Sequence, residues 1–211
     1  MNLDAWRILM EGLTPDGVDC HSYSPALGNG STAEFETSLL LYSLVRRFRP
    51  LVICDTGTNF GTATACMALA LRDNWVDYQH KPKGVIHTVD STNYPQSEPL
   101  WEKLDVRDFI RKTVSDSLVA PVPQDIDMLF LDSDHKASHI IAEWNHFAPS
   151  LNRKRALVLN HDTQLDPRSG DAMREILTDH LDPILEYRLV SYVPLRNMRG
   201  IDLLFLSNEV Y

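Results

Sequence analysis

The chain has 211 residues, of which 44% are apolar and 23% charged, and its formal net charge is −9. These values lie near the averages of globular proteins, and a chain of this length can bury a single core. The negative charge argues against a partner with a phosphate backbone, because nucleic-acid binding normally needs a concentrated positive surface. No stretch approaches the roughly 18 consecutive apolar residues that would cross a bilayer. Composition therefore favours a globular domain that acts on small molecules.

The first residues carry acids at Asp4 and Glu11 and lack a basic flank before an unbroken apolar run. This is not the pattern of a secretory signal, so we expect a cytoplasmic location. The three cysteines, Cys20, Cys54 and Cys66, are odd in number and lack metal-ligand spacing. They are predicted to be reduced thiols that act as small apolar side chains.

The N-terminal part of the chain predicts one short helix and one long loop. An amphipathic helix is expected at about residues 3–12, and a loop rich in Pro, Gly and Ser at 13–31. Ser31 or Thr32 can cap a second helix that ends before Pro50, with Glu34 completing a capping box. We expect a single domain over residues 1–211, in which 1–32 form the helix and a flap-like loop and 33–211 form the core.

From residue 51 onward, short apolar runs alternate with helical stretches, which is typical of a parallel sheet covered by helices on both faces. The expected strands lie at 51–54, 85–89, 111–114, 127–131, 156–159, 187–193 and 201–206, and the expected helices at 62–72, 101–110, 137–147 and about 171–181. The last two strands are joined by only a short connection, so they must be antiparallel. The sequence thus predicts an α/β fold: a Rossmann-like, doubly wound, mostly parallel seven-stranded sheet with a C-terminal antiparallel hairpin.

The first strand-to-helix turn reads LVICDTGTNFGTATA, with Asp55 at the strand end and glycines at 57 and 61. Glycine lets the backbone approach a ligand, and the following helix start offers free amide groups. The second strand ends in Asp90, where an acid can accept hydrogen bonds from two ribose hydroxyls. The alternatives without a ligand are a tight turn that only packs a helix on a strand, for the first motif, and a solvent-exposed aspartate at a strand end, for the second.

The fourth and fifth strands are followed by DSDHKASH and HDT. Ligands bind outside the carboxyl ends of the strands in a doubly wound sheet, so these side chains should gather at one mouth. The set is Asp132, Asp134, His135, His161 and Asp162. Asp132, His161 and Asp162 can offer oxygen, nitrogen and oxygen ligands to one divalent cation.

Together, the segments DTGTNFG (55–61), VIHTVD (85–90), IDMLFLDSDH (126–135) and LVLNHDT (157–163) resemble the class I S-adenosylmethionine-dependent methyltransferases. Within this class the similarity is closest to the cephalosporin-hydroxylase-type branch and to the macrolide and catechol O-methyltransferases. It runs from about Phe35 to Leu206. The resemblance implies O-methylation of a hydroxyl on a small-molecule acceptor, with S-adenosylmethionine as cofactor. The net charge and the lack of a long apolar run argue against nucleic-acid and membrane partners, and a homodimer is left open.

Carried over by position, the resemblance places cofactor contacts along much of the chain. Those around the methionine part and the ribose are Asp55, Gly57, Thr58, Asn59, Gly61, Asp90 and Ser91. In the turn RKTVSDS, Asp116 and Ser117 match the adenine-contacting positions. Asp132 falls among the cofactor contacts and also on the first metal ligand, and His161 and Asp162 fall on the paired ligands after the fifth strand.

His135 falls on the general base of this group. An imidazole suits the task because its ordinary pKa of about 6.5 permits proton uptake near neutrality. The other six histidines do not lie beside such candidate site residues in the sequence. His161 stands where relatives often carry Asp or Glu; it can bind magnesium less naturally than a softer metal, or it can hydrogen-bond Asp162 or the substrate without any metal.

Two other classes of function remain open from the sequence. A nicotinamide-dependent oxidoreductase shares the alternating strands and the ribose acid, but Asn59 stands where its fingerprint needs a middle glycine. A binding module with the methyltransferase fold and no catalysis is the non-enzymatic alternative. The many charged residues expected at one edge of the sheet argue against such a module, because burying charges is costly and a protein without catalysis does not require them.

Overall fold

The computed structural model describes residues 4–6, 8, 33, 35–78, 82–164, 167–180, 182, 184–195 and 199–209. Residues 4–6 and 8 are helical, as expected for the N-terminal helix. The rest of that helix, the flap-like loop at 13–31 and the capping box of Ser31, Thr32 and Glu34 lie outside the described residues. Over the described ranges, no helix combines the length and the apolar character needed to cross a membrane.

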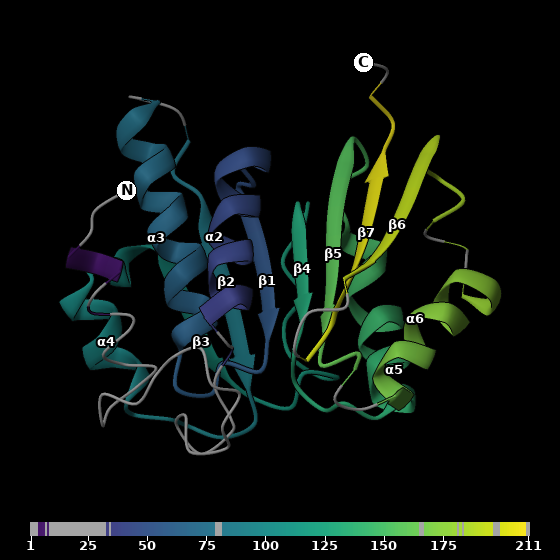
Figure 1. The fold of residues 1–211 in the computed structure, drawn as a ribbon, viewed down its shortest axis with the longest axis horizontal. Helices are drawn as coiled ribbons and strands as arrows, with labels where there is room; N and C mark the ends of the chain where they lie inside the picture. Colours follow the sequence, from purple (N-terminus) through teal and green to yellow (C-terminus); the bar gives the residue numbers. More distant parts are fainter. Residues whose placement is uncertain are drawn as a thin grey trace. The chain divides into compact units, whose positions relative to one another are not determined.

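Seven strands form one mixed sheet in the order β3-β2-β1-β4-β5-β7-β6 (Figure 1). The strands are β1 (Val52–Thr56), β2 (Val85–Asp90), β3 (Ile110–Val114), β4 (Met128–Leu131), β5 (Arg155–His161), β6 (Leu189–Leu195) and β7 (Ile201–Ser207). The pairs β2–β3, β1–β4 and β4–β5 are parallel, whereas β7 runs antiparallel to both β5 and β6. This confirms the predicted sheet and its C-terminal hairpin.

The chain divides into two compact units. The first unit comprises Met1–Leu51 and Thr58–Val114, and the second comprises Val52–Gly57 and Ser115–Tyr211. The single domain expected over residues 1–211 stays a prediction.

In the first unit, α2 (Phe35–Phe48) packs along α3 (Thr62–Asp77). The residues of α3 from Thr62 to Leu71 are all buried, because small Ala, Thr and Cys side chains let its neighbours approach on every side. The Tyr42 hydroxyl donates to Asp73 at 2.7 Å, which ties α2 to α3.

The helix expected over 101–110 is wrong in both its bounds. The helix α4 (Ser97–Lys103) begins earlier and ends at Lys103, a short 3-10 turn follows at Arg107–Phe109, and β3 begins at Ile110. The physical reason is Asp105, whose φ of 55° lies in the left-handed region, where an α-helix cannot continue. Trp101 is fully buried and its indole N–H donates to the Gly61 carbonyl at 2.9 Å, so this ring packs within the first unit.

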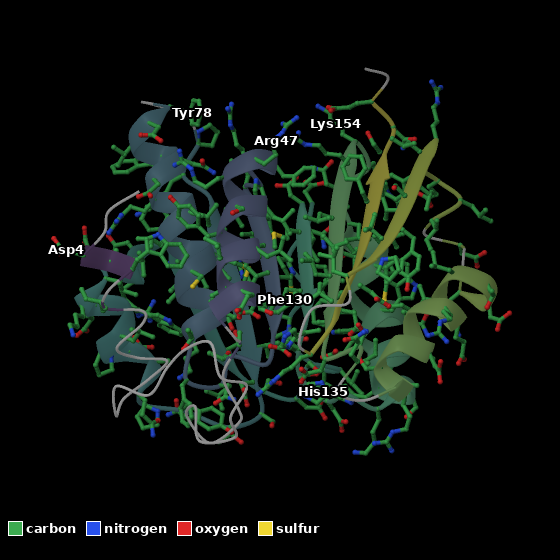
Figure 2. The ribbon with its side chains drawn as sticks, viewed as in Figure 1. Asp4, Arg47, Tyr78, Phe130, His135 and Lys154 are labelled. Carbon is green, nitrogen blue, oxygen red and sulfur yellow. The ribbon has the colours of Figure 1, made fainter. Side chains whose placement is uncertain are left out.

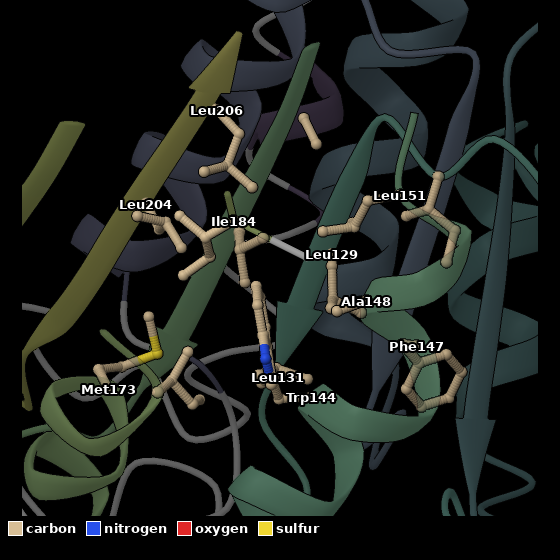
Figure 3. Close-up of a cluster of buried hydrophobic side chains, with 14 of the residues drawn as sticks. Leu129, Leu131, Trp144, Phe147, Ala148, Leu151, Met173, Ile184, Leu204 and Leu206 are labelled. Atoms are coloured by element: carbon tan, nitrogen blue, oxygen red, sulfur yellow. The ribbon is translucent and has the colours of Figure 1, made fainter. Parts of the chain in front are cut away.

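In the second unit, β4 is buried along its whole length and β5 along all but its first residue, as their continuous apolar runs predict. The core of this unit is a cluster between these strands, β7, α5 (Ala137–Phe147) and α6 (Pro167–Asp179) (Figure 3). Leu129 and Leu131 of β4 meet Trp144 and Phe147 of α5 in this cluster, in which Leu204 of β7 also takes part. The core fixes β4 and β5 side by side, and with them the residues that follow each strand.

Candidate functional site

The first turn presses directly on the backbone that follows β4. Gly57 has a φ of 92°, and a Cβ placed there would lie 2.0 Å from the Asp132 carbonyl oxygen and 3.1 Å from Ser133 Cα. The Asp132 amide in turn donates to the Thr56 carbonyl at 3.1 Å. Only glycine fits at position 57, because the turn needs both the left-handed conformation and the missing side chain.

Asp132, His161 and Asp162 meet as the sequence predicts. Each offers one ligand atom, and these atoms all lie within 4.8 Å of one another. The His161 Nδ1–H donates to Asp132 Oδ1 at 2.8 Å, and the same nitrogen lies 3.5 Å from Asp162 Oδ1. The imidazole of His161 thus bridges two carboxylates, one from each strand end.

His135 joins the cluster through Asp162. Its Nε2 lies 3.1 Å from Asp162 Oδ2, and its side chain is 36% exposed whereas that of Asp162 is 4% exposed. Burial raises the pKa of Asp162, the Asp132 charge adds to the rise, and His161, His135 and Arg199 oppose it. A buried carboxylate facing a half-exposed imidazole is the arrangement in which an acid orients a histidine and stabilises its protonated form.

Arg199 is a site residue that the sequence reasoning missed. It lies between β6 and β7, and its Nη1 is 3.9 Å from Asp162 Oδ1. The segment 199–200 is fixed there because the Gln164 amide donates to the Arg199 carbonyl at 2.6 Å. The segment PLRNMRG held no signal that distinguished this arginine from a solvated turn residue.

Asp134 does not join the gathered side chains, which corrects one expectation. Its carboxylate accepts from the Lys136 amide at 3.0 Å and from Lys136 Nζ at 2.8 Å, and its side chain is 41% exposed. It closes a local turn with Lys136. Figure 2 shows His135 beyond the carboxyl end of β4, at the opposite end of the second unit from Lys154, which precedes β5.

Asp55 lies within β1 and not at its end, since the strand continues to Thr56. It is fully buried and is opposite Phe130 of β4. Burial, with smaller contributions from the charges of Asp55 and Glu143, raises the pKa of the neighbouring Cys54 thiol. Cys54 and Cys66 are both buried and unpaired, in agreement with the prediction of apolar thiols.

In the first unit, Asp90 is oriented by backbone donors. Its Oδ2 accepts from the Asn59 amide at 2.9 Å and its Oδ1 from the Thr92 amide at 2.8 Å. Each carboxylate oxygen keeps lone pairs for further donors, which is what two ribose hydroxyls would need. Asn59 reaches this position with a φ of 46°, and Ser91 beside Asp90 is exposed.

Two further residues of the first turn are held inside the first unit. The Thr58 hydroxyl is buried and lies 2.7 Å from that of Thr88 on β2. Gly61 has a φ of 82°, and a Cβ there would lie 2.7 Å from Trp101 Nε1 and 2.8 Å from Ser97 Cβ. Thr58 and Gly61 therefore shape the turn, whatever else they contact.

The turn after β3 connects to a buried network that the sequence did not reveal. Asp116 is exposed and accepts from the Leu118 amide at 2.9 Å, whereas Ser117 is buried. The Ser117 hydroxyl lies 3.2 Å from His139 Nε2, which lies 3.6 Å from Glu143 Oε1. The expectation that the other six histidines lie apart from candidate site residues is thus wrong for His139. Its i,i+4 spacing from Glu143 was the available signal.

The donor set of Asp132, His161 and Asp162 fits a divalent cation. It contains two carboxylates and one imidazole, and the buried Asp162 carboxylate is of a kind that requires positive partners. The mixed oxygen and nitrogen set suits a borderline metal better than magnesium, which prefers oxygen alone.

Solved structures of methyltransferases share this fold. The O-methyltransferase TomG of Streptomyces achromogenes, involved in tomaymycin synthesis and solved with SAM, is 17% identical with a TM-score of 0.64; 95% of this chain and 89% of that one are covered. An O-methyltransferase of Bacillus cereus in complex with SAH is 15% identical with a TM-score of 0.63, covering 98% of this chain and 92% of that one. A methyltransferase of Geobacter sulfurreducens is 18% identical with a TM-score of 0.62, covering 86% and 85%.

No curated protein matches the chain in sequence. A family model described as a methyltransferase domain matches residues 54–163, a span that begins beside Asp55 and ends just past Asp162. It includes the first turn, Asp90 and the residues after β4, and it covers more than half of the chain. The protein therefore belongs to the methyltransferase domain family.

Proposed function

We propose that the protein transfers a methyl group from S-adenosylmethionine to a hydroxyl oxygen of a small molecule, with His135 as general base. The single observation that carries this proposal is the 3.1 Å contact between His135 Nε2 and the buried Asp162. The solved O-methyltransferases that share the fold include one with SAM and one with SAH, which supports the choice of cofactor.

The contact between His135 and Asp162 supports a direction for the proton transfer. Nε2 of His135 faces the Asp162 carboxylate at 3.1 Å, so we assign the uptake of the hydroxyl proton to the other ring nitrogen, Nδ1. Asp162 then stabilises the imidazolium that forms and does not itself gain or lose a proton. S-adenosylmethionine, when bound, supplies a methyl group activated by its sulfonium, so the protein's task is to place the acceptor oxygen and remove its proton.

The cofactor contacts are assigned unit by unit. In the first unit we assign Thr58, Asn59 and Gly61 to the turn beside the cofactor, Asp90 to the ribose hydroxyls, and Ser91 to the adjacent rim. In the second unit we assign Asp55, Gly57 and Asp132 to the methionine part and Asp116 and Ser117 to the adenine. The backbone donors that orient Asp90 support its role, because they leave the carboxylate fixed and still able to accept.

A divalent cation held by Asp132, His161 and Asp162 would act as a Lewis acid that lowers the pKa of an acceptor hydroxyl. Two carboxylates in one buried cluster support this assignment. Arg199 adds positive charge beside Asp162 and shares the same carboxylate oxygen with His161, so it belongs to the groups that a cation would have to displace or tolerate.

The remaining features of the proposal concern partners and location. The net charge of −9 supports a small-molecule acceptor over nucleic acid, and the buried unpaired thiols Cys54 and Cys66 support a reducing, cytoplasmic compartment. We also propose one domain over residues 1–211 and a homodimer formed through the N-terminal helix, of which only residues 4–6 and 8 are described.

The test compares wild-type protein with His135→Ala, using calorimetry with S-adenosylhomocysteine and a panel of small phenols and alcohols with labelled S-adenosylmethionine. We expect His135→Ala to lower kcat by about 10²–10⁴-fold, the usual contribution of a general base, while cofactor affinity changes less than twofold. Loss of cofactor binding in this variant would make His135 structural. Binding of NAD in place of S-adenosylhomocysteine would point to the oxidoreductase, and cofactor binding without turnover of any acceptor to the binding module.

A further inference from the structure

Glu143 of α5 is a buried carboxylate that the proposed reaction does not use. Its side chain is 0% exposed, and its Oε1 accepts from the Ser133 hydroxyl at 2.7 Å. Its Oε2 makes no hydrogen bond within the described part of the chain. A carboxylate of this kind is costly to bury, and an apolar side chain of the same size would fit a helix that otherwise packs Ile140, Trp144 and Phe147 into the core.

The contacts of Glu143 lead to two segments that carry site residues. Ser133 follows Asp132 directly and lies two positions before His135, in the loop after β4. On the other side, His139 lies 3.6 Å from the same Oε1 of Glu143, and its Nε2 is 3.2 Å from the Ser117 hydroxyl in the turn after β3. One buried carboxylate thus holds groups from both segments.

We propose that Glu143 is a positioning residue: through Ser133 it holds the loop that carries Asp132 and His135, and through His139 it holds Ser117. The proposal rests on the function proposed for His135. Ser133 is held on two sides. Its hydroxyl donates to Glu143, and its Cα lies close to Gly57, where an added Cβ would come within 3.1 Å of it. The loop between Asp132 and His135 therefore cannot shift toward the first turn and is held back from solvent by Glu143.

The electrostatics of the network are consistent with this role. The contact with Glu143 raises the pKa of His139, burial opposes the rise, and the charges of Glu143, Asp134 and Asp116 add to it. Oε1 of Glu143 lies 3.6 Å from His139 Nε2 and accepts from the Ser133 hydroxyl at 2.7 Å. One carboxylate oxygen is therefore placed to hold both side chains.

The experiment uses four variants of the full chain: Ser133→Ala, Glu143→Ala, Glu143→Gln and the double variant Ser133→Ala/Glu143→Ala. Glu175→Gln is the matched control, since Glu175 of α6 also faces a histidine, His180, at 3.8 Å but is half exposed. Three quantities are measured: amide hydrogen exchange of residues 132–136, affinity for S-adenosylhomocysteine by calorimetry, and kcat.

We expect Ser133→Ala to speed amide exchange in residues 132–136, to lower kcat about tenfold and to weaken cofactor binding only slightly, through Asp132 in the same loop. Glu143→Ala should show the same losses and should weaken cofactor binding further, about tenfold, because His139, which contacts Ser117, also loses its partner. The double variant should have the same kcat and amide exchange as Glu143→Ala, since both substitutions remove the same Ser133–Glu143 hydrogen bond. Glu143→Gln keeps an acceptor for Ser133 and should restore most of kcat, and Glu175→Gln should match wild type.

Wild-type exchange and kcat in Ser133→Ala would overturn the proposal, and so would full additivity in the double variant. If Glu143→Ala does not fold, Ser133→Ala and Glu143→Gln still decide it. If the wild type methylates no hydroxyl, the proposed function fails by itself, and the exchange and cofactor-binding measurements continue to test Glu143.

Discussion

Replacing Gly57 with alanine tests the contact on which the second unit's site is built. The new methyl carbon would lie 2.0 Å from the Asp132 carbonyl oxygen, 1.4 Å short of the 3.4 Å at which ordinary contact begins. An alanine in the left-handed region costs about 1–2 kcal/mol, and forcing an extra carbon into a packed site adds about 1–3 kcal/mol. We therefore expect the free energy of unfolding to fall by about 2–5 kcal/mol, which corresponds to a loss of roughly 10 °C in Tm for a chain of this size.

The matched control is Gly84→Ala, whose φ is not left-handed and whose Cβ would lie 2.7 Å from the end of the Leu71 side chain and 3.1 Å from the Pro50 carbonyl oxygen. It should cost less than Gly57→Ala, because the end of a side chain can adjust and the Pro50 carbonyl is approached far less closely than the Asp132 carbonyl. Urea unfolding followed by circular dichroism measures the free energy of unfolding of both variants. Calorimetry with S-adenosylhomocysteine measures how far a displaced Asp132 and Ser133 weaken cofactor binding in folded Gly57→Ala. Equal destabilisation by the two substitutions would refute the idea that the Asp132 backbone makes position 57 intolerant.

Three further predictions concern single groups of the two units. Asp90→Ala removes a charged acceptor of two ribose hydroxyls and should weaken S-adenosylhomocysteine binding about 100-fold by calorimetry; unchanged affinity would remove Asp90 from the cofactor site. Asp162→Asn should abolish any stimulation of turnover by Mn²⁺, Zn²⁺ or Mg²⁺, and full activity of chelator-treated wild type would exclude the metal. The raised pKa of His139 means that its ion pair stabilises the fold fully below the unfolded pKa of about 6.5 and is lost as pH rises through the higher folded value. Unfolding in urea between pH 5.5 and 8.5 should therefore show a decline of stability with pH that is smaller in His139→Gln, and parallel pH profiles for both proteins would contradict it. The charged groups facing His139 are Glu143, Asp134 and Asp116.

The sheet could be predicted from the sequence because its central strands β1, β4 and β5 are buried almost along their whole length. Continuous apolar runs as short as those of β4 and β5, separated by helical stretches, are typical of buried parallel strands. The short connection between β6 and β7 dictated an antiparallel pair. The prediction of a helix over 101–110 was wrong because the apolar spacing of this segment is helical. The break at Asp105 depends on a left-handed backbone conformation that aspartate can adopt but does not require, so the sequence does not predict it.

The candidate site was predictable where it depends on strand ends. Asp132, His161 and Asp162 come together because β4 and β5 are neighbours, and position in the chain alone conveys that. Arg199 was missed because its contact with Asp162 joins segments distant in sequence, and Glu143 was missed because the sequence does not show that its side chain on α5 points into the core. Asp134 was wrongly included for the same reason: its neighbour Lys136 competes for the carboxylate, and spacing does not reveal which partner wins.

Asp162 has a φ of 59°, a conformation that aspartate adopts only at some energetic cost and that glycine adopts freely. A glycine at this position would relieve the strain after β5, but it would also leave His161 and Arg199 without the carboxylate that they face. The strained backbone is thus the cost of placing one carboxylate where three positively charged or polar side chains can reach it.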